Sequence, residues 1–482
     1  MSRVVALQAG WATAAGPPLP AMNFNTDAAV LQKFCDCLKS ARAYDAATLM
    51  IWIAPTDKDT DTSLEKRLWD AAGQAVPAPG SGLKPREYSG GRLQGPVLGT
   101  KVNTAIRVLL GVLLLMGAVL PVVAAAGLFI NDRGELLLHG VRFRGIGVNY
   151  YDAFTRTFGQ TARTNYDAGF RELAARKIPF ARFSAGGFWP QDWGLYRTNR
   201  SEYFARLDGV VKSAGQHGIG LIPSLFWHMS AVPDLVGEPC NRWGDPHSRT
   251  IAFMREYTRE IVTRYSPSPA IWGWEFGNEY NLVADLPNAS EHRPPVLPGL
   301  GTPAQRSAED ELTHAAIRVA VREFAIEIRK YDPRRIIISG NAFPRVSAWH
   351  QAIEKSWKPD TREQFAEVLA TDNPSPINTL SVRGYDLASD IGRLDQAMTV
   401  AQAAKKPLFV GEFGVPGAAT GESKTKFAAI LSAIETNRVT LSALWVFDFD
   451  DQAKDWNVTG TNDRSWQLDA IRQANGRMRR NR

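Results

Sequence analysis

The chain has 482 residues, of which 44% are hydrophobic, 22% charged and 10% aromatic. This composition excludes a wholly disordered chain, a collagen-like repeat and a polytopic membrane protein. The 56 basic and 49 acidic residues leave a formal charge of only +7, which does not indicate a nucleic-acid partner. Three cysteines are too few for a disulfide framework, and the Cys35 and Cys37 pair has no second pair with which to bind a metal.

An uncharged apolar segment of 23 residues, Val108–Ile130, divides the chain. An arginine precedes it, and its three consecutive alanines within Ala124–Gly127 are typical of a signal-peptidase site. Two interpretations remain open. Residues 101–126 are a signal peptide, in which case translation begins near Val102, or the segment spans a membrane as a signal anchor.

Either interpretation places the rest of the chain outside the cytoplasm, as a secreted or periplasmic protein or as one held at the membrane by residues 108–130. Residues 1–100 show no motif for chemistry, and the Pro/Gly-rich composition of residues 76–100 is typical of a linker. We therefore expect residues 1–100 to be a disordered or untranslated extension and residues 101–126 to be the export segment. Residues 127–482 then form one large domain, which we expect to be a monomer.

Residues 127–482 alternate short buried strands with amphipathic helices. Apolar runs predict eight strands, at residues 141–149, 179–185, 218–226, 271–278, 335–340, 377–383, 407–412 and 441–447. Helical patterns lie between them, at residues 165–177, 203–217, 250–265, 308–331, 394–405 and 424–437. Strands that alternate with helices are expected to pair in parallel, because the chain must cross back along the sheet between two parallel strands and a helix usually makes that connection. Eight such strand-helix units predict an α/β protein with the (β/α)8 TIM barrel fold.

The predicted strands end in residues suited to catalysis, and barrel enzymes carry their chemistry at these carboxyl ends. The fourth strand ends in Asn278 and Glu279, and the seventh ends in Gly-Glu-Phe-Gly, which contains Glu412. Two carboxylates across the barrel mouth suit retaining glycoside hydrolysis, in which one attacks the anomeric carbon and the other protonates the leaving oxygen. This reaction requires no metal or organic cofactor. Glu275 lies a turn deeper on the same strand, and we predict a structural role for it.

Tryptophans gather at strand ends and on the loops that follow, where flat rings can pack against the apolar faces of sugars. They are Trp189, Trp193, Trp227, Trp243, Trp445 and Trp456. Loop anchoring is the alternative interpretation, and the sequence leaves it open for Trp189, Trp193 and Trp243. The loop at residues 280–307 is too proline-rich for a helix, and we expect it to wall the same cleft.

Together these motifs resemble glycoside hydrolase family 5, the cellulase and mannanase family of a large clan of retaining barrels. The resemblance covers about residues 127–470 and rests on Arg182, W-E-F-G-N-E (274–279), Tyr385, V-G-E-F-G (410–414) and Trp445. It implies that Glu279 is the acid/base and Glu412 the nucleophile. It also implies that Asn278 binds the sugar 2-hydroxyl, and that Tyr385 and Arg182 orient the nucleophile.

The same resemblance makes Trp445 the floor of the subsite beside the cleaved bond, and it matches His228 with the family's histidine on the third strand. Trp189 and Trp227 are further candidates for contact with the sugar. One position departs from the family pattern, because the sixth strand ends with Arg383 where the family usually has histidine. An arginine there lowers the pKa of a neighbouring carboxyl group, which suits a nucleophile better than an acid.

We therefore expect an enzyme that hydrolyses a β-linked polysaccharide or oligosaccharide, β-glucan or β-mannan, through a covalent glycosyl-enzyme. Three alternatives remain: a transglycosylase that uses the same carboxylates, an exo-acting β-glycosidase of the same clan, and a non-catalytic carbohydrate-binding barrel. Arg383 motivates the last of these. The sequence does not distinguish glucose from mannose, which differ in one axial hydroxyl group.

Overall fold

A computed structural model describes residues 5–10, 22–24, 50–54, 127–158, 164–186, 188–385, 387 and 390–480. The first three segments are strands β1 (Val5–Gly10), β2 (Met22–Phe24) and β3 (Met50–Ala54), which pair antiparallel in the order β2-β1-β3. The rest of residues 1–126 lies outside the described residues, so the predicted disordered extension, linker, cysteine pair and export segment stay predictions. Among the helices of the described segments, none is both long and apolar enough to cross a membrane.

Eight parallel strands form one sheet in the order β11-β10-β9-β8-β7-β14-β13-β12. They are β7 (Gly145–Asn149), β8 (Phe180–Ser184), β9 (Gly220–Phe226), β10 (Gly273–Gly277), β11 (Ile336–Ile338), β12 (Leu380–Arg383), β13 (Leu408–Phe413) and β14 (Leu441–Leu444). A parallel bridge between Ile338 and Thr379 joins the two end strands, so the sheet closes on itself. The (β/α)8 barrel is confirmed, and each predicted strand overlaps one barrel strand, but the run at residues 141–149 is divided between β7 of the barrel and a short strand of another sheet, Val141–Arg142.

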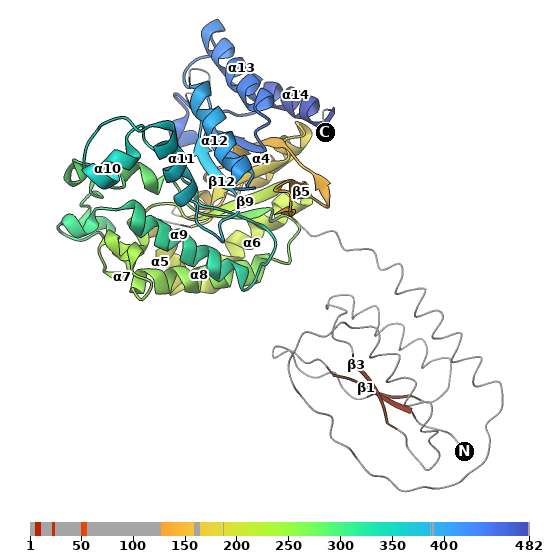
Figure 1. The fold of residues 1–482 in the computed structure, drawn as a ribbon. Helices are drawn as coiled ribbons and strands as arrows, with labels where there is room; N and C mark the ends of the chain where they lie inside the picture. The colour runs from red at the N-terminus through yellow and green to blue at the C-terminus, as the bar shows by residue number, and fades with distance from the viewer. Residues whose placement is uncertain are drawn as a thin grey trace, which may run out of the picture. The chain divides into compact units, whose positions relative to one another are not determined.

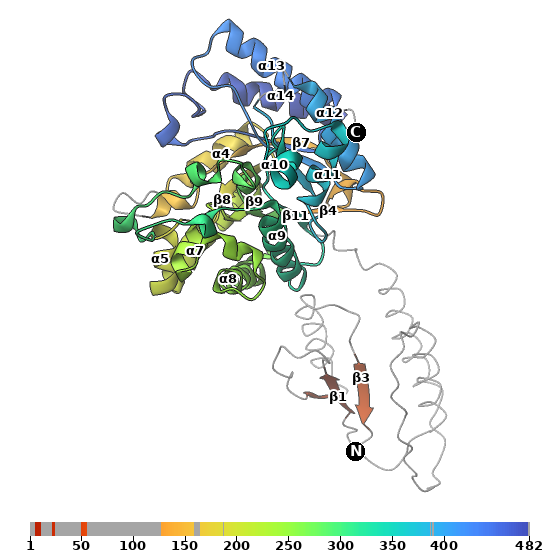
Figure 2. The same ribbon diagram turned by 60° about the vertical axis from the view of Figure 1, so that its left-hand side comes forward.

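Helices follow the strands and cover the outside of the barrel (Figures 1 and 2). The longer ones are α4 (Tyr166–Ala175), α6 (Arg200–Gln216), α8 (Arg249–Tyr265), α9 (His314–Arg329), α11 (Arg362–Thr371), α12 (Ile391–Ala403), α13 (Gly421–Thr436) and α14 (Trp466–Arg480). Shorter helices lie in the connections, and they are α5 (Gln191–Thr198), α7 (Ala231–Val236) and α10 (Ala348–Glu354). Each barrel strand is therefore held from outside by a packed helix layer.

The largest error in a predicted helix boundary concerns the helix predicted at residues 308–331. The sequence pattern starts a helix at residue 308, whereas α9 begins at His314. The Thr313 side chain accepts a hydrogen bond from the amide of Ala316 and caps the helix there. The residues before it form the separate 3-10 turn η8 (Ala308–Asp310), which Ser307 caps. Polar caps therefore override the apolar periodicity at this helix start.

The amino-terminal ends of the barrel strands enclose an apolar floor. Strands β4 (Leu128–Ile130), β5 (Leu136–Leu138) and β6 (Val141–Arg142) form a small antiparallel sheet at this end. The amide of Leu128 donates to the carbonyl of Trp272 at 2.8 Å. The interior here is filled by Leu128, Phe143, Phe180, Ile222, Trp272, Ile336, Ile338, Phe409 and Leu441. Polar side chains occupy the opposite, carboxyl-terminal end.

Candidate active site

Glu279 and Glu412 lie at the carboxyl ends of β10 and β13. Glu412 belongs to β13 and its side chain is 4% exposed, whereas Glu279 follows β10 and its side chain is 28% exposed. Arg383 lies between them, with its Nε 3.3 Å from Glu412 Oε1 and 3.9 Å from Glu279 Oε1. These two contacts limit the separation of the two Oε1 atoms to about 7 Å. The structure therefore brings the two predicted carboxylates into one site.

Three side chains hold Glu412 in one orientation. Arg182 Nη1 donates to its Oε1 at 2.9 Å, and the Tyr385 hydroxyl donates to its Oε2 at 2.6 Å. Arg383 completes the set through its ion pair with Oε1. Burial and the charge of Glu412 raise the pKa of Tyr385, so the tyrosine keeps its proton and remains a donor. Two cations and one hydroxyl thus stabilise a negative charge on a fixed carboxylate.

Arg182 is fully buried and acts only through other side chains. Its Nε donates to Glu275 Oε1 at 2.7 Å, and its Nη2 donates to Asn278 Oδ1 at 2.9 Å. Its guanidinium lies 4.4 Å from the ring centroid of Trp227. Because no part of Arg182 is exposed, it cannot contact a substrate, and its place is that of a residue that orients Glu412. Glu275 is also fully buried, as a structural residue would be.

The side-chain amide of Asn278 contacts two arginines through its oxygen alone. Its Oδ1 accepts hydrogen bonds from Arg182 Nη2 and Arg383 Nη2, both at 2.9 Å. Only the carbonyl end of an amide can accept from two arginines, so the Nδ2 end is left for a ligand. A hydrogen-bond donor for a sugar hydroxyl group is therefore available beside the carboxylates.

Glu279 lies in a different electrostatic environment from Glu412. Burial of the carboxyl group and the nearby negative charge of Glu412 raise the pKa of Glu279, while Arg383 and Arg182 act in the opposite direction. A raised pKa favours the protonated carboxyl group, which a general acid needs. The backbone of Glu279 has φ 56°, so the chain turns sharply at the end of β10 and the side chain does not continue the strand.

An aromatic wall lies beside the carboxylates. The rings of Trp445 and Trp227 stack with centroids 6.2 Å apart and an interplanar angle of 27°. Trp445 is half-buried, and its indole donates to Gln452 Oε1 at 2.8 Å. Tyr151 packs against both tryptophans, with centroid distances of 4.8 Å to Trp227 and 5.7 Å to Trp445. Tyr151 was not among the residues predicted from the sequence, although its position as an aromatic residue just beyond the end of β7 was a usable signal.

Trp189 and His228 lie on loops above the strand ends. The Trp189 indole donates to the carbonyl of Gly301 at 3.0 Å and so fixes the long loop after β10. Gly301 has φ 81°, and a Cβ there would lie 2.4 Å from the indole nitrogen, so this contact requires glycine. His228 is exposed, with its ring centroid 6.4 Å from that of Phe188. The roles of Trp189 and His228 in binding sugar stay predictions.

Trp193 and Trp243 are not sugar platforms, and that interpretation of them is wrong. Both side chains are fully buried. Trp193 packs edge-to-face on Tyr257 with centroids 4.6 Å apart, and the Trp243 indole donates to the carbonyl of Met229 at 2.7 Å. Trp193 therefore anchors α5, and Trp243 anchors the 3-10 turn η4 (Cys240–Gly244).

The long loop after β10 contains only 3-10 turns, as its prolines predict. They are η5 (Tyr280–Val283), η6 (Ala289–His292), η7 (Pro298–Leu300) and η8 (Ala308–Asp310). A buried ion pair fixes the loop to α7, because Arg306 Nη1 and Nη2 donate to the two oxygens of Asp234 at 2.7 and 2.9 Å. Leu282 of this loop and Glu279 line the same hollow. The loop thus forms part of the wall of the site.

That hollow beside Glu279 measures about 390 Å³. Its lining comes from the ends of β10 and β12 and from the loops after β11 and β12. Two of its residues, Arg345 and Trp357, were missed by the sequence analysis. They lie well beyond the end of their strand, where strand-end reasoning gives no signal. The described residues contain no group of three or more His, Cys, Asp or Glu side chains that could hold a metal ion.

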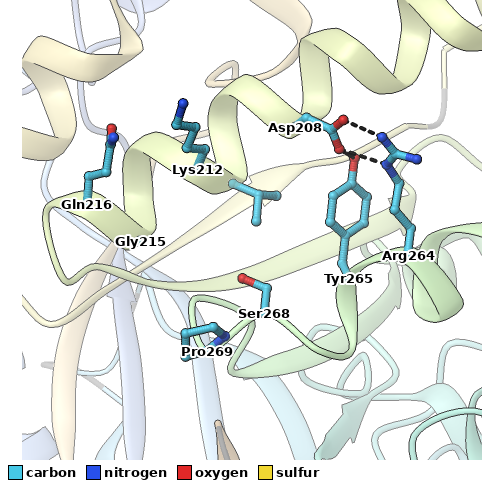
Figure 3. A pocket seen from close by; sticks show the side chains of 9 residues that line it. Asp208, Lys212, Gly215, Gln216, Arg264, Tyr265, Ser268 and Pro269 are labelled. Carbon is cyan, nitrogen blue, oxygen red and sulfur yellow. Dashed lines mark hydrogen bonds and ion pairs between the residues drawn. The ribbon is translucent and has the colours of Figure 1, made fainter. Parts of the chain in front are cut away.

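A larger hollow of about 620 Å³ lies between α6 and the segment that follows α8 (Figure 3). Asp208 accepts hydrogen bonds here from Arg264 Nε at 2.7 Å and from the Tyr265 hydroxyl at 2.8 Å (Figure 3). The lining residues come from the carboxyl-terminal parts of α6 and α8. Barrel helices run antiparallel to the strands, so this hollow is at the end opposite to the carboxylates.

The sequence is similar to a known family and to curated mannanases. The family model described as Cellulase (glycosyl hydrolase family 5) matches residues 141–451. A probable mannan endo-1,4-beta-mannosidase A-1 of Aspergillus terreus is 39% identical over 80 residues, which are 15% of this chain and 21% of that protein. Mannan endo-1,4-beta-mannosidase A of Hypocrea jecorina is 27% identical over 188 residues, 34% of this chain and 41% of that protein. The chain therefore spans less than half the length of these relatives.

The fold is similar to that of solved mannanases. The endo-1,4-beta-mannanase from Rhizomucor miehei aligns with a TM-score of 0.53 and 15% identity over 74% of this chain and 100% of its own. A glycoside hydrolase family 5 mannosidase from the same organism aligns with a TM-score of 0.52 and 12% identity over the same shares. At these identities the similarity supports the barrel fold.

Proposed function

The chain belongs to the cellulase family, glycosyl hydrolase family 5, and we propose that it hydrolyses β-1,4-linked mannan with retention of the anomeric configuration. The observation that carries this proposal is the contact of Arg383 with both Glu279 and Glu412. It keeps the two Oε1 atoms within about 7 Å of each other, a limit compatible with the roughly 5–5.5 Å of retaining enzymes. Mannan is favoured over glucan because the curated relatives described above are mannan endo-1,4-beta-mannosidases by name.

In the first step, Glu412 acts as the nucleophile. One of its oxygens attacks the anomeric carbon while the bond from that carbon to the leaving oxygen breaks. Glu279 gives its proton to the leaving oxygen, which departs as a sugar hydroxyl group. Arg182 and Tyr385 keep the attacking carboxylate in line, and the Asn278 Nδ2 group is positioned to donate to the sugar 2-hydroxyl.

In the second step, Glu279 acts as the base. Formation of the glycosyl ester removes the negative charge of Glu412, and with it one of the two causes that raise the pKa of Glu279. Arg383 and Arg182 keep their positive charges, so the pKa of Glu279 falls and its carboxylate can take a proton from water. The resulting hydroxide attacks the anomeric carbon and releases Glu412. A second displacement at the same carbon restores the original configuration.

Arg383 supports a catalytic barrel rather than a silent one. It contacts the nucleophile, the acid and Asn278 Oδ1 together, and its Nη2 also donates to the carbonyl of Gly340 at 2.8 Å. A residue with these contacts holds the two carboxylates in place. The departure from the family's histidine therefore leaves the paired-carboxylate geometry intact.

The experiment that tests this function uses the full chain on β-1,4-mannan, glucomannan and β-1,4-glucan. Product sizing distinguishes endo from exo cleavage, and proton NMR of the first product reports its anomeric configuration. We expect internal cleavage of mannan and a β-anomer as first product. Added acceptor sugars test transglycosylation. No release of sugar from any of these substrates, or an α-anomer as first product, would overturn the proposal.

We also propose that the protein acts outside the cytoplasm. The support is the uncharged segment at residues 108–130 and its run of alanines before Gly127. Expression of the full chain and of the chain that starts at Val102 in a bacterial host, followed by fractionation and N-terminal sequencing, tests this. We expect a mature protein that begins at Gly127 in the medium or periplasm, or an intact chain in the membrane fraction if the segment stays as an anchor. An intact chain in the cytoplasm would contradict both interpretations.

A further inference from the structure

We propose that the 390 Å³ hollow beside Glu279 binds the leaving-group sugar and prefers a sugar that carries a carboxylate, such as a hexuronic acid. The inference rests on the proposed hydrolase function and adds a ligand class that this function does not require. Four residues carry it: Glu279, Trp357, Arg345 and Arg393, all of which line the hollow.

The position of the hollow assigns it to the leaving group. The aromatic wall of Trp227, Trp445 and Tyr151 follows β9, β14 and β7, whereas the hollow is lined from the ends of β10 and β12 and the loops after β11 and β12. The two sets of loops lie on opposite sides of the line that joins the ends of β10 and β13. Glu279 lines the hollow, and the sugar that receives its proton is the one that leaves.

Trp357 provides an apolar surface in this hollow. Its side chain is 52% exposed, although it is a large aromatic residue. The ring is therefore accessible to a ligand in the hollow, which Glu279 also lines. Flat aromatic rings in such positions pack on the C–H faces of pyranose sugars. A sugar bound beside Glu279 therefore has a surface to pack against.

Arg345 brings a positive charge to the hollow and has no carboxylate partner among the described residues. Its Nε donates to the carbonyl of Leu282 at 2.6 Å, and the residue is half-buried. Within the described part of the chain, no carboxylate lies within 4 Å of its guanidinium. The other two arginines of the hollow have carboxylate partners, because Arg383 pairs with Glu412 and Arg393 Nε lies 3.5 Å from Asp390 Oδ2.

A carboxylate is the ligand group that fits this arginine. With its Nε held by a carbonyl, Arg345 retains its Nη groups, which form the planar fork that binds carboxylates at two points. Among the described residues, the acidic side chains that line the hollow are Glu279 and Asp390. In the proposed mechanism Glu279 carries its proton when substrate binds, and Asp390 lies beside Arg393. Neither therefore cancels the charge of Arg345.

Binding measurements test the proposal without requiring turnover. The full chain with Glu412→Gln is titrated calorimetrically with β-1,4-mannobiose and with the same disaccharide carrying mannuronic acid at its reducing end. We expect the acidic disaccharide to bind at least about tenfold more tightly, since a charged hydrogen-bonded pair is worth at least one factor of ten. The preference should shrink as salt is raised. Equal affinities would overturn the proposal.

Matched variants assign the preference to Arg345. Arg345→Ala should abolish the preference, so that the acidic and the neutral disaccharide bind with equal affinity, while Arg345→Lys should keep most of it. The control is Arg334→Ala, which removes the same charge from an exposed arginine just before β11, at the opposite end of the barrel. A preference that survives Arg345→Ala, or that Arg334→Ala removes equally, would overturn the assignment. Circular dichroism of each variant checks that it is folded.

This result is independent of the test of the proposed function. If the unsubstituted chain cleaves neutral mannan but shows no preference for the acidic disaccharide, only the present inference fails. If it cleaves no β-glycan but binds the acidic disaccharide through Arg345, the hydrolase proposal fails and the hollow remains a binding site for acidic sugars.

Discussion

The two ends of the barrel interior are built from the same strands but are stabilised by different interactions. On β8, Phe180 lies in the apolar floor, and two residues later Arg182 lies among charged groups, yet both side chains are fully buried. Residues two apart on a strand share a face, so both point into the barrel. The floor gains from removing apolar surface from water, whereas the upper layer keeps buried charges only because each has a partner. One strand therefore contributes Phe180 to the apolar floor that stabilises the fold and Arg182 to the charged layer that holds the carboxylates.

The largest effect that would test this division is the loss of activity in Glu412→Gln. The substitution keeps the shape of the side chain and removes the nucleophile that we propose, so we expect hydrolysis of mannan to fall by at least about 10⁴-fold. Initial rates on mannan measure this. The variant should melt at a lower temperature, because Arg182 and Arg383 lose a charged partner, so circular dichroism at the assay temperature serves as the control for folding. Retained activity would place the chemistry elsewhere.

A comparison of Arg182→Met with Phe180→Ala would show what each layer contributes to stability. Arg182→Met leaves Glu275 and Glu412 without their shared cation, and we expect a loss of about 3–5 kcal/mol in the free energy of unfolding. Phe180→Ala opens a cavity in the floor and should cost about as much. Urea unfolding measures both. Activity at a temperature where both variants are folded separates them, because only Arg182→Met should be inactive.

Arg383→Gln would sharpen the electrostatic part of the comparison. Loss of a charged contact to the nucleophile should lower kcat/KM about 10- to 100-fold. Arg383 lowers the pKa of Glu279, so its removal raises that pKa further, and Glu279 keeps its proton to higher pH. The alkaline limb of the pH profile of kcat/KM should therefore move to higher pH. Arg383→Lys, which keeps the charge, should move it less, and an unmoved limb in both variants would contradict this role.

The smallest expected effect is a gain of stability in Glu279→Gln. A carboxyl group whose pKa is raised by folding binds more protons in the folded state, so its contribution to stability is lost as pH rises through the folded pKa. At neutral pH the unsubstituted protein therefore carries a penalty that glutamine removes. We expect the melting temperature to rise by about 1–3 °C at pH 7 and to stay unchanged at pH 4. A lower melting temperature at pH 7 would show that Glu279 stabilises the fold.

The barrel strands and the two carboxylates were accessible to sequence reasoning for a physical reason. A strand buried on both faces must be apolar along its length, so the runs at residues 218–226 and 407–412 are visible without any tertiary information. Parallel strands must all end on one side, so Glu279 and Glu412 could be assigned to the same mouth. Both inferences depend only on local composition and on chain order.

The loop residues were not accessible in this way. Trp193 and Trp227 both follow strand ends, yet the structure buries Trp193 among α5, β9 and α8 and places Trp227 over Arg182. Arg345 and Trp357 reach the hollow only because the loop after β11 folds back to Glu279. These positions depend on packing between segments far apart in the chain, which no local pattern encodes.

For this protein, the sequence alone determined the barrel fold and the prediction that Glu279 and Glu412 lie at one mouth of it. Both depend on the pattern of apolar residues along the chain and on the order of the strands. Only the tertiary structure decided that Arg383 bridges both acids, that Arg182 is sealed from substrate, and which tryptophans face solvent. The reason is that burial and charge pairing are set by atoms contributed from several loops at once.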